Sequence, residues 1–378
     1  MRSSEKVYLV IASINPLDNL PEIFTRDNKT PSKIVIVDEG DESVRKYNSE
    51  ILRRLGLLHE FYGPREREKW FRERFGSSYE RYLSLIPERS HAETSFGFLV
   101  SFEEDADYII ELDDDVFQDQ EYRLVSDHLD NLNETPGVLI SSSSKWINTI
   151  DFLDVNIDRA ERIFPRGHPY DPSVRSYVYT IRESVRDSCI LNMGLWTGHP
   201  DLDAVTILIY GGLDGRSIIR SAKILQSKVI AERGSYFAVC SMNTSFRRDL
   251  VPAFYQLYMR YMGVDRFDDI WSGIFAKKIA DALGDRFCLG KPALRHDKRP
   301  RSVWKDLRAE LEGMIMNEIL WRIVDEAEIY SRKYVDAYRE LAQHLEKNIN
   351  RFRDENHIKF IKIQVEKMYT WTEAIDKI

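Results

Sequence analysis

Short apolar runs separated by longer segments of mixed polarity characterise the first third of the chain. Residues 6–13 (KVYLVIAS), 33–37 (KIVIV) and 106–112 (ADYIIEL) are apolar, rich in β-branched side chains and of strand length. Between them, residues 42–57 and 91–103 carry apolar side chains at helical spacing. Strands that alternate with helices predict a parallel sheet covered on both faces, and such sheets bind ligands at the carboxyl ends of their strands.

The character of the chain changes twice after this region. The middle third interrupts its short apolar runs with proline and glycine, as in FPRGHPYDPS (164–173) and YGGLDGRS (210–217). From Ser302 onward, helical periodicity continues with almost no glycine or proline. This pattern predicts an α/β domain over residues 1–300 and a helical C-terminal extension over residues 301–378, which covers the first domain or a neighbouring subunit. We expect a homo-oligomer that assembles through these helices.

The overall charge excludes some partners. The chain has 54 Lys and Arg residues against 62 Asp and Glu residues, a formal net charge of −8. Nucleic-acid-binding proteins are usually basic, so this class is disfavoured.

The apolar runs are far shorter than a membrane span, and the amino terminus lacks a signal-peptide pattern, so we expect a cytoplasmic protein. Three widely spaced cysteines argue against a disulfide framework and against a cysteine-based zinc site.

Three adjacent carboxylates, Asp113, Asp114 and Asp115, follow the third predicted strand directly. They repel one another, and a divalent cation offsets that repulsion well. Carboxylate oxygens suit Mg²⁺ or Mn²⁺, whose coordination is often completed by the phosphates of a substrate. The cluster therefore predicts a metal site, with a solvated acidic turn or a helix cap as the alternative.

Two further pairs of acidic residues are candidate site residues. Asp38 and Asp41 end the second predicted strand, where they could accept hydrogen bonds from a nucleoside or cap the following helix. Asp268 and Asp269 precede an apolar helical segment and could equally be the acidic first turn of a helix.

Basic side chains provide candidate phosphate contacts. His296 follows a short apolar run and is a candidate metal ligand, although a lone histidine is more often structural. The side chains around it could bind phosphate; these are Arg295, Lys298, Arg299 and Arg301. Arg166 stands beside Gly167, which would let the backbone approach a ligand closely; its alternative is a solvated arginine in a surface turn.

Several motifs of other enzyme classes are missing from the sequence. The chain contains neither a P-loop nor a G-x-G-x-x-G dinucleotide motif, and the glycines at 211, 212 and 215 lack the strand-to-helix context. Flavin and NAD chemistry are therefore disfavoured.

Taken in order, eight segments resemble a known family, the plant reversibly glycosylated polypeptides, whose members are UDP-arabinopyranose mutases, and the related microbial nucleotide-sugar pyranose mutases. The segments cover about residues 6–300, and the C-terminal helices share less with the family. They are VIASINPLDNL, IVIVDEGDE, SFGFLVS before YIIELDDDVF, FPRGHPY, NMGLWTGHPDLDAVT, FAVCSMNTSFRRDL, RFDDIWSGIFAKKI and LRHDK.

The resemblance implies a glycosyltransferase-A-like (Rossmann-like) mixed sheet flanked by helices, a bound nucleoside diphosphate sugar, and a divalent metal, usually Mn²⁺ with Mg²⁺ as the alternative. The metal ligands that it implies are Asp113, Asp115 and His296. The residues that it implies for nucleotide-sugar binding are Ser13, Asn15, Asp38, Asp41, Asp114, Trp196 and Asn243. The catalytic residues that it implies are Asp268, Asp269, Arg166 and Arg182; the residues that flank Arg166 and precede Arg182 depart from the family pattern.

These observations predict a flavin-independent mutase that interconverts pyranose and furanose forms of a nucleotide sugar. The family associates the arginine matched by Arg166 with self-glycosylation. A guanidinium stays protonated and is a poor nucleophile, so we interpret Arg166 first as an electrostatic clamp. The alternatives are a glycosyltransferase with a glycan or protein acceptor, and a nucleotide-sugar-binding scaffold protein.

Overall fold

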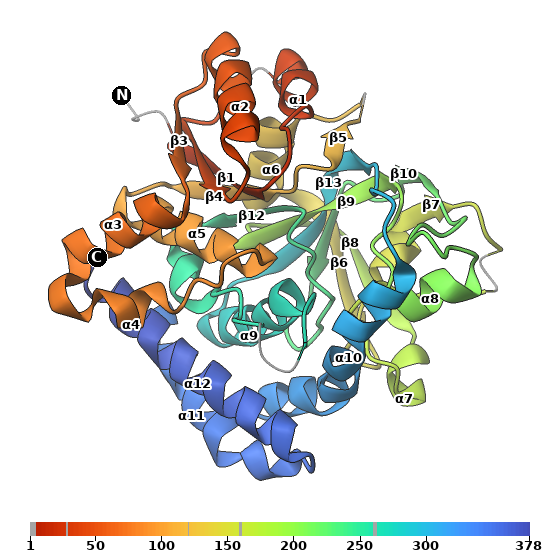
Figure 1. The fold of residues 1–378 in the computed structure, drawn as a ribbon. Coiled ribbons are helices and arrows are strands. Elements are labelled where there is room, and N and C mark those ends of the chain that lie inside the picture. The colour runs from red at the N-terminus through yellow and green to blue at the C-terminus, as the bar shows by residue number, and fades with distance from the viewer. Residues whose placement is uncertain (1–4, 28, 120, 159–160, 260–262) are drawn as a thin grey trace.

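A single mixed sheet runs through the centre of the molecule and carries helices on both of its faces (Figure 1). The computed structural model describes residues 5–27, 29–119, 121–158, 161–259 and 263–378. The strands are β1 Val7–Ser13, β2 Lys33–Asp38, β3 His59–Tyr62, β4 Tyr108–Leu112, β5 Val116–Gln118, β6 Thr135–Ser142, β7 Leu153–Val155, β8 Tyr179–Asp187, β9 Leu191–Gly198, β10 Ser221–Ile224, β11 Lys228–Ala231, β12 Asn243–Arg247 and β13 Phe287–His296. The α-helices are α1 Leu20–Arg26, α2 Glu42–Arg54, α3 Pro64–Phe75, α4 Tyr79–Leu83, α5 Thr94–Glu103, α6 Leu124–Leu132, α7 Pro172–Arg175, α8 Ala204–Ile209, α9 Asp268–Leu283, α10 Val303–Asp325, α11 Tyr334–Lys347 and α12 Glu355–Ile375.

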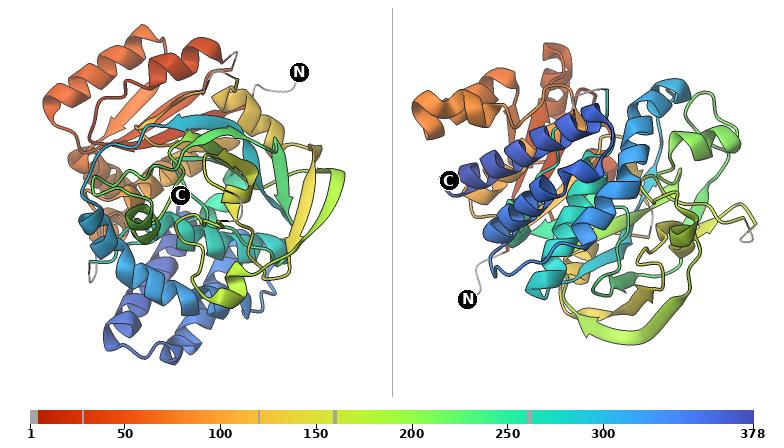
Figure 2. Two further views of the ribbon diagram at one scale, coloured as in Figure 1. Left: turned by 90° about the vertical axis from the view of Figure 1, so that its right-hand side faces the viewer. Right: turned by 90° about the horizontal axis from the view of Figure 1, so that it is seen from below.

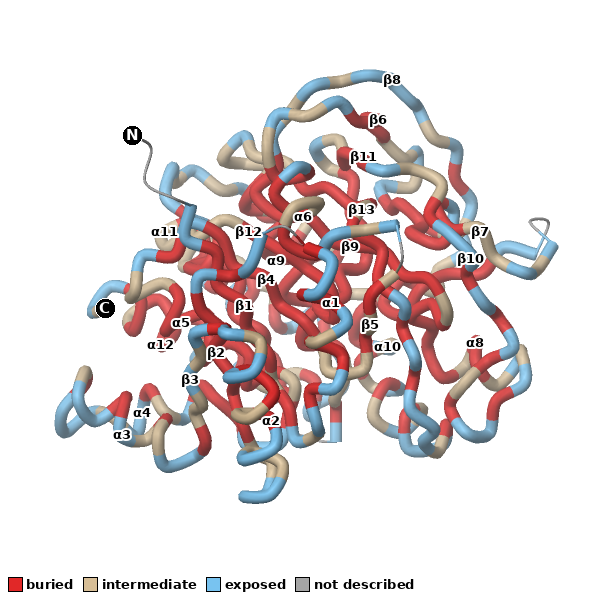
Figure 3. Tube along the Cα trace, turned by 90° about the horizontal axis from the view of Figure 1, so that it is seen from above, coloured by how far each residue is buried: buried red, intermediate tan, exposed pale blue. Residues whose placement is uncertain are grey.

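The first four strands form the parallel part of the sheet, in the order β3-β2-β1-β4. Val10 of β1 pairs with Val35 of β2 and with Glu111 of β4. Figure 3 shows β1, β2 and β4 as buried along almost their whole length, which explains their apolar sequences, because helices cover both faces. The edge strand β3 is only partly buried. The predicted α/β arrangement of this region is confirmed.

The rest of the sheet is mixed in direction. Strand β12 lies antiparallel between β4 and β9, after which the order continues β13-β11-β6-β8. Strand β13 is parallel to β9 and antiparallel to β11, and β8 is an edge strand with mostly exposed side chains. Since few of these neighbours are consecutive in the chain, the apolar pattern alone did not predict their order.

Two of the three cysteines are joined, although the number and spacing of the cysteines argued against a disulfide framework. Cys189 and Cys288 form a disulfide, with their Cα atoms 5.9 Å apart. They are 99 residues apart in sequence, but Cys189 leads into β9 and Cys288 lies in β13, and these strands are neighbours in the sheet. The third, Cys240, is buried and free.

The C-terminal helices pack directly on the α/β part of the chain. Helix α10 contacts α8 and α9, α11 contacts α9, and α12 contacts α11 and α4 (Figure 2). Gly313 of α10 lies so close to Phe267 that a Cβ at this position would be 2.4 Å from the ring atom Cδ2. The helical extension therefore shares one hydrophobic core with the preceding residues.

An oligomer that assembles through these helices would need apolar side chains on their outer surface. The apolar faces of α11 and α12 are buried within the chain, whereas α10 exposes Trp304, Leu311 and Ile315. Oligomerisation through these helices stays a prediction. Within the described part of the chain, none of the helices combines the length and apolar character needed to cross a membrane.

Candidate active site

A cavity of about 700 Å³ opens at the carboxyl ends of β1, β2 and β4. This volume is typical of small-molecule sites, roughly 300–1,000 Å³. The first turn of α9, the loop at residue 166 and the segment after β13 close its other sides. Its lining is dominated by charged side chains; the carboxylates are Glu39, Asp41, Glu93, Asp113, Asp114, Asp115, Asp201, Asp265, Asp268 and Asp269, and the cations are Arg89, Arg166, Arg266, Lys298, Arg299 and Arg301. The strand-end position predicted from the sequence is where the cavity lies.

Asp114 joins the ends of β1 and β4. Its Oδ2 accepts hydrogen bonds from Ser13 Oγ at 2.5 Å and from Asn15 Nδ2 at 3.0 Å. Arg299 Nη1 donates to Oδ1 at 2.7 Å. Burial raises the pKa of Asp114, although the hydrogen bond from Ser13 and the charge of Arg299 oppose the change. Three of the predicted site residues, Ser13, Asn15 and Asp114, thus form one network on the wall of the cavity.

Asp115 and His296 face each other across the same end of the sheet, with Nε2 of the imidazole 3.7 Å from Oδ2 of the carboxylate. His296 Nδ1 donates to the carbonyl of His199 at 2.7 Å, which leaves Nε2 as the ring nitrogen on the side of Asp115. Histidine ligands of metals are commonly oriented in this way. Burial would raise the pKa of Asp115, but the hydrogen bond and charge of His296 outweigh it and lower that pKa.

A divalent ion fits this pair only with help from a substrate. Within the described residues, no three His, Cys, Asp or Glu side chains gather in a way that could hold a metal. The pair supplies one carboxylate and one imidazole, and Mg²⁺-like ions are frequently held by one or two side chains together with substrate phosphates. Asp113, the third predicted ligand, contacts His91 instead.

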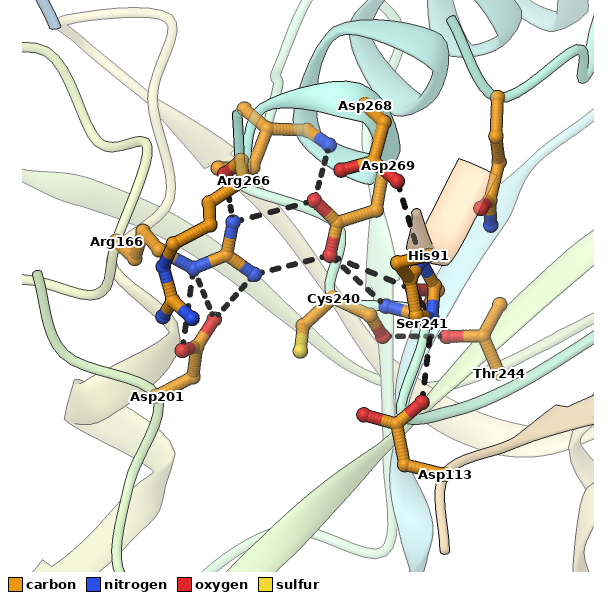
Figure 4. Close-up of polar contacts among 12 residues, drawn as sticks. His91, Asp113, Arg166, Asp201, Cys240, Ser241, Thr244, Arg266, Asp268 and Asp269 are labelled. Carbon is orange, nitrogen blue, oxygen red and sulfur yellow. Dashed lines mark hydrogen bonds and ion pairs between the residues drawn. The ribbon is translucent and has the colours of Figure 1, made fainter. Parts of the chain in front are cut away.

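His91 bridges the acidic cluster after β4 and the acidic pair on α9 (Figure 4). Its Nδ1 lies 3.1 Å from Asp268 Oδ2, and its Nε2 lies 3.2 Å from Asp113 Oδ1. Burial would lower the pKa of His91, but the negative charges of Asp113 and Asp268 outweigh this and raise it well above its usual value. His91 therefore holds positive charge between carboxylates that are 155 positions apart in sequence.

Arg166 donates hydrogen bonds with all three nitrogens of its guanidinium (Figure 4). Its Nε donates to Asp201 at 3.1 Å and 3.2 Å, and its two terminal nitrogens donate to Asp269 at 3.0 Å and 3.2 Å. Nη1 also donates to the carbonyl of Arg266. Burial would lower the pKa of Arg166, yet Asp201 and Asp269 raise it well above its ordinary value. In return, Arg166 outweighs burial and holds the pKa of Asp201 at about 2.

Helix α10 supports this part of the site. Gly167 has a φ of +85°, and a Cβ there would lie 2.6 Å from Ile270, so the loop can rest on α9 only with glycine at this position. Asn317 of α10 donates to the carbonyl of Gly167 at 2.9 Å and accepts from Trp271 Nε1 at 3.0 Å. Glu310, also from α10, accepts from Arg266 Nε at 2.6 Å.

Asp38 and Asp41 have different surroundings. Asp41 lines the cavity, but its Oδ1 also accepts the backbone N–H groups of Ser43 and Val44, both at 2.9 Å, and so caps α2. Asp38 is buried, accepts from the N–H of Gly40 at 3.1 Å and does not line the cavity. The helix-cap alternative thus describes Asp41.

Three predicted site residues lie elsewhere. Trp196 is buried in β9, and Asn243 is buried in β12, where it bonds with His128 and with the carbonyl of Pro292. Arg182 lies on the edge strand β8, where its exposed side chain pairs with Glu232. None of the three lines the cavity. Trp196 and Asn243 belong to family segments that also contain cavity residues, but both side chains are buried in the sheet, and Arg182 lies on its exposed edge.

Sequence reasoning missed several cavity residues, among them His91, Asp201 and Arg266. His91 is a lone histidine at the start of a predicted helix, and Asp201 stands in an irregular segment. The only available signal was that Asp201 and Arg266 belong to two of the segments that carry the family resemblance.

Comparisons with known proteins agree with the motifs. The family model described as "Reversibly glycosylated polypeptide" matches residues 82–378, which includes the C-terminal helices that the motifs did not cover. UDP-arabinopyranose mutase 2 and UDP-arabinopyranose mutase 1 of Arabidopsis thaliana are each 26% identical over 99% of this chain, and over 92% and 93% of their own lengths.

UDP-arabinopyranose mutase 1 of Oryza sativa subsp. japonica is 25% identical over 99% of this chain and 91% of its own length. Among solved structures, mouse xyloside xylosyltransferase 1 in its apo form covers 37% of this chain and 53% of its own, at 14% identity and a TM-score of 0.20, which is too low to inform the comparison. Because the family model spans more than half of the sequence, the chain belongs to the reversibly glycosylated polypeptide family.

Proposed function

We propose that this protein is a metal-dependent mutase that interconverts the pyranose and furanose forms of a nucleoside diphosphate sugar, with a UDP-sugar as the first candidate. The observation that carries the proposal is that the Asp113–Asp115 cluster and the Arg166–Asp269 pair line the same cavity. One side of the cavity thus has groups suited to a metal and diphosphate, and the other has buried carboxylates suited to a sugar cation. Relatives named UDP-arabinopyranose mutase match nearly the whole chain.

Asp115 and His296 would hold Mn²⁺, with Mg²⁺ as the alternative, and a divalent ion bound there would offset the charge of the diphosphate and make it a better leaving group. Ser13, Asn15 and Arg299 keep Asp114 fixed beside this position. The nucleoside would then lie toward the ends of β1 and β2, near Gly40 and Asp41.

The reaction breaks the bond between the anomeric carbon and a phosphate oxygen, and the electron pair leaves with the diphosphate. Asp269, or its neighbour Asp268, stabilises the resulting oxocarbenium-like sugar by its negative charge. A different hydroxyl of the sugar then attacks the anomeric carbon, the original ring C–O bond breaks, and the proton lost by the attacking hydroxyl ends on the released ring oxygen. The diphosphate returns to the anomeric carbon. Substrate and product are isomers, so the step balances without an oxidant or reductant, and neither flavin nor NAD is required.

Arg166 serves in this proposal as a clamp on Asp269 rather than as a sugar acceptor. All three guanidinium nitrogens already donate to oxygen atoms of Asp201, Asp269 or Arg266. A protonated guanidinium in such a network has no free electron pair with which to attack the sugar.

The test is to incubate the purified protein with Mn²⁺ and a panel of UDP- and GDP-pentoses and hexoses, and to separate pyranose from furanose products by chromatography. We expect a furanose product from at least one donor and loss of the activity with a chelator. No conversion of any donor would overturn the proposal, and a product that forms only with an added glycan or protein acceptor would replace it with the transferase.

A further inference from the structure

Lys298 is a buried cation that faces the cavity. It follows β13, two residues after His296, and lines the cavity with only 6% of its surface exposed. Within the described ranges of the chain, its ammonium group makes no hydrogen bond and no ion pair, whereas buried charges are normally paired.

The neighbouring cations of the cavity are already paired. Arg166 binds Asp201 and Asp269, and Arg266 binds Glu310 at 2.6 Å. Arg299 binds Asp114 at 2.7 Å, and Arg301 binds Asp306 at 2.9 Å. Lys298 therefore differs from these four arginines in having no carboxylate within ion-pair distance among the described residues.

The charges around Lys298 do not compensate for its isolation. Arg266 and Arg301 repel it, while Asp201 and Asp306 attract it from beyond contact distance. An ammonium group in this position gains most from an anion that enters the cavity. Sugars and nucleobases are neutral, so the diphosphate is the part of the proposed substrate that supplies the missing charge.

We propose that Lys298 binds a phosphate oxygen of the diphosphate and stabilises the charge that develops when the diphosphate leaves the sugar. The identity of the ligand rests on the proposed function, whereas the choice of Lys298 over its neighbours rests on its lack of a partner. Arg299 and Arg301 were equally good candidates for phosphate binding in the sequence, but each would first have to break its ion pair with Asp114 or Asp306.

The experiment measures the binding of UDP, uridine and inorganic pyrophosphate to the wild type and to Lys298→Met by titration calorimetry with Mn²⁺ present. A hydrogen bond to a charged group contributes about 1.5–3 kcal/mol, so we expect affinity for UDP and pyrophosphate to fall by about 10- to 100-fold and affinity for uridine to stay unchanged. Lys298→Arg should recover part of the loss. Lys305→Met, an exposed lysine seven residues further on, is the matched control and should bind as the wild type does.

Thermal unfolding provides a second readout that a structural role would not produce. Because an isolated buried charge is unfavourable in the free protein, Lys298→Met should unfold at the same or a higher temperature than the wild type without ligand. The rise in melting temperature on addition of UDP should be smaller for Lys298→Met.

Three results would overturn the inference. They are equal pyrophosphate affinity in the wild type and Lys298→Met, an equal loss of uridine and UDP binding, and a lower melting temperature of the ligand-free variant. A wild type that converts no nucleotide sugar but binds pyrophosphate through Lys298 would contradict only the proposed function. A wild type that converts the sugar and needs no Lys298 for UDP binding would contradict only this inference.

Discussion

Arg166 and Asp269 are joined end to end, with Nη1 3.2 Å from Oδ1 and Nη2 3.0 Å from Oδ2. Two parallel hydrogen bonds of this kind fix direction as well as distance. Asp201 occupies the remaining edge of the guanidinium, so the loop at residue 166 and the first turn of α9 are held in one orientation. We infer that this pair aims the Asp269 carboxylate at the sugar.

Arg166→Lys should show whether turnover depends only on the positive charge of Arg166 or also on the geometry of its guanidinium group. A lysine keeps the positive charge but cannot bind two carboxylates in parallel. We expect turnover to fall about 100-fold, as for the loss of one oriented charge-stabilising group, while the protein stays folded. Mass spectrometry of the wild type after incubation with a nucleotide sugar should show an unmodified Arg166. A pentose or hexose on that side chain would instead establish it as the acceptor.

His91→Asn should weaken the link between Asp113 and Asp268. Asparagine can donate a hydrogen bond to one of the two carboxylates but brings no positive charge. Since Asp268 is buried, we expect the free energy of unfolding to fall by about 1–3 kcal/mol and turnover to fall at least tenfold. Urea unfolding and the mutase assay measure these effects, and wild-type values in both would exclude the bridging role.

Asp115→Asn tests the proposed metal position. The amide lacks the charge of the carboxylate, so Mn²⁺ affinity in the presence of UDP should fall at least tenfold and metal-dependent turnover should be lost. Electron paramagnetic resonance of free Mn²⁺ gives the affinity directly. Asp130→Asn, an exposed aspartate that pairs with Lys291, is the control. Unchanged Mn²⁺ binding by Asp115→Asn would rule out this ligand.

Gly313→Ala tests how closely α10 packs on the rest of the chain. Alanine is the better helix former by about 1 kcal/mol, so an exposed site would be stabilised. Here the new methyl group would meet the buried ring of Phe267, and overpacking typically costs about 1–3 kcal/mol. We expect urea unfolding to show net destabilisation, with Lys305→Ala on the exposed face near neutral; a more stable Gly313→Ala would disprove the tight contact.

Buried His168 should make the protein sensitive to mild acid. Burial, together with the charge of Arg175, lowers the pKa of His168 to about 3, against about 6.5 in the unfolded chain. The unfolded state therefore binds the proton first as the pH falls below about 6.5, and stability is lost progressively down to about pH 3. Between pH 7 and pH 5 the loss from this residue is about 2 kcal/mol.

His168→Phe should remove that loss, since His168 packs against the aromatic rings of Trp146 and Phe164. Urea unfolding at pH 7 and pH 5 compares the variant with the wild type, and His59→Phe at a half-buried site is the control. An equal drop in stability for His168→Phe and the wild type would contradict the assignment.

The local pattern of the sequence was sufficient for the parallel part of the sheet and for one edge of the site. Strands buried on both faces are apolar throughout, so β1, β2 and β4 were recognisable one by one. Parallel neighbours end at the same edge, so the pattern placed Asp38, Asp41 and the Asp113–Asp115 cluster at one edge of the sheet. All of these except Asp38 line the cavity.

The tertiary structure alone decided which distant residues complete the site. Apolar periodicity indicates that a segment is buried but not which strand lies beside it, so the insertion of β12 between β4 and β9 could not be foreseen. Arg166 and Asp269 are 103 residues apart in sequence, and His91 and Asp268 are 177 apart. Helix α10, which supports the site, lies after residue 300, where the sequence predicted the end of the α/β domain. The kinds of elements and the acidic chemistry at their ends could be predicted from the chain alone. Only packing decided which charges are paired and that Lys298 is left without a partner among the described residues, because pairing depends on distances between segments that the chain pattern does not encode.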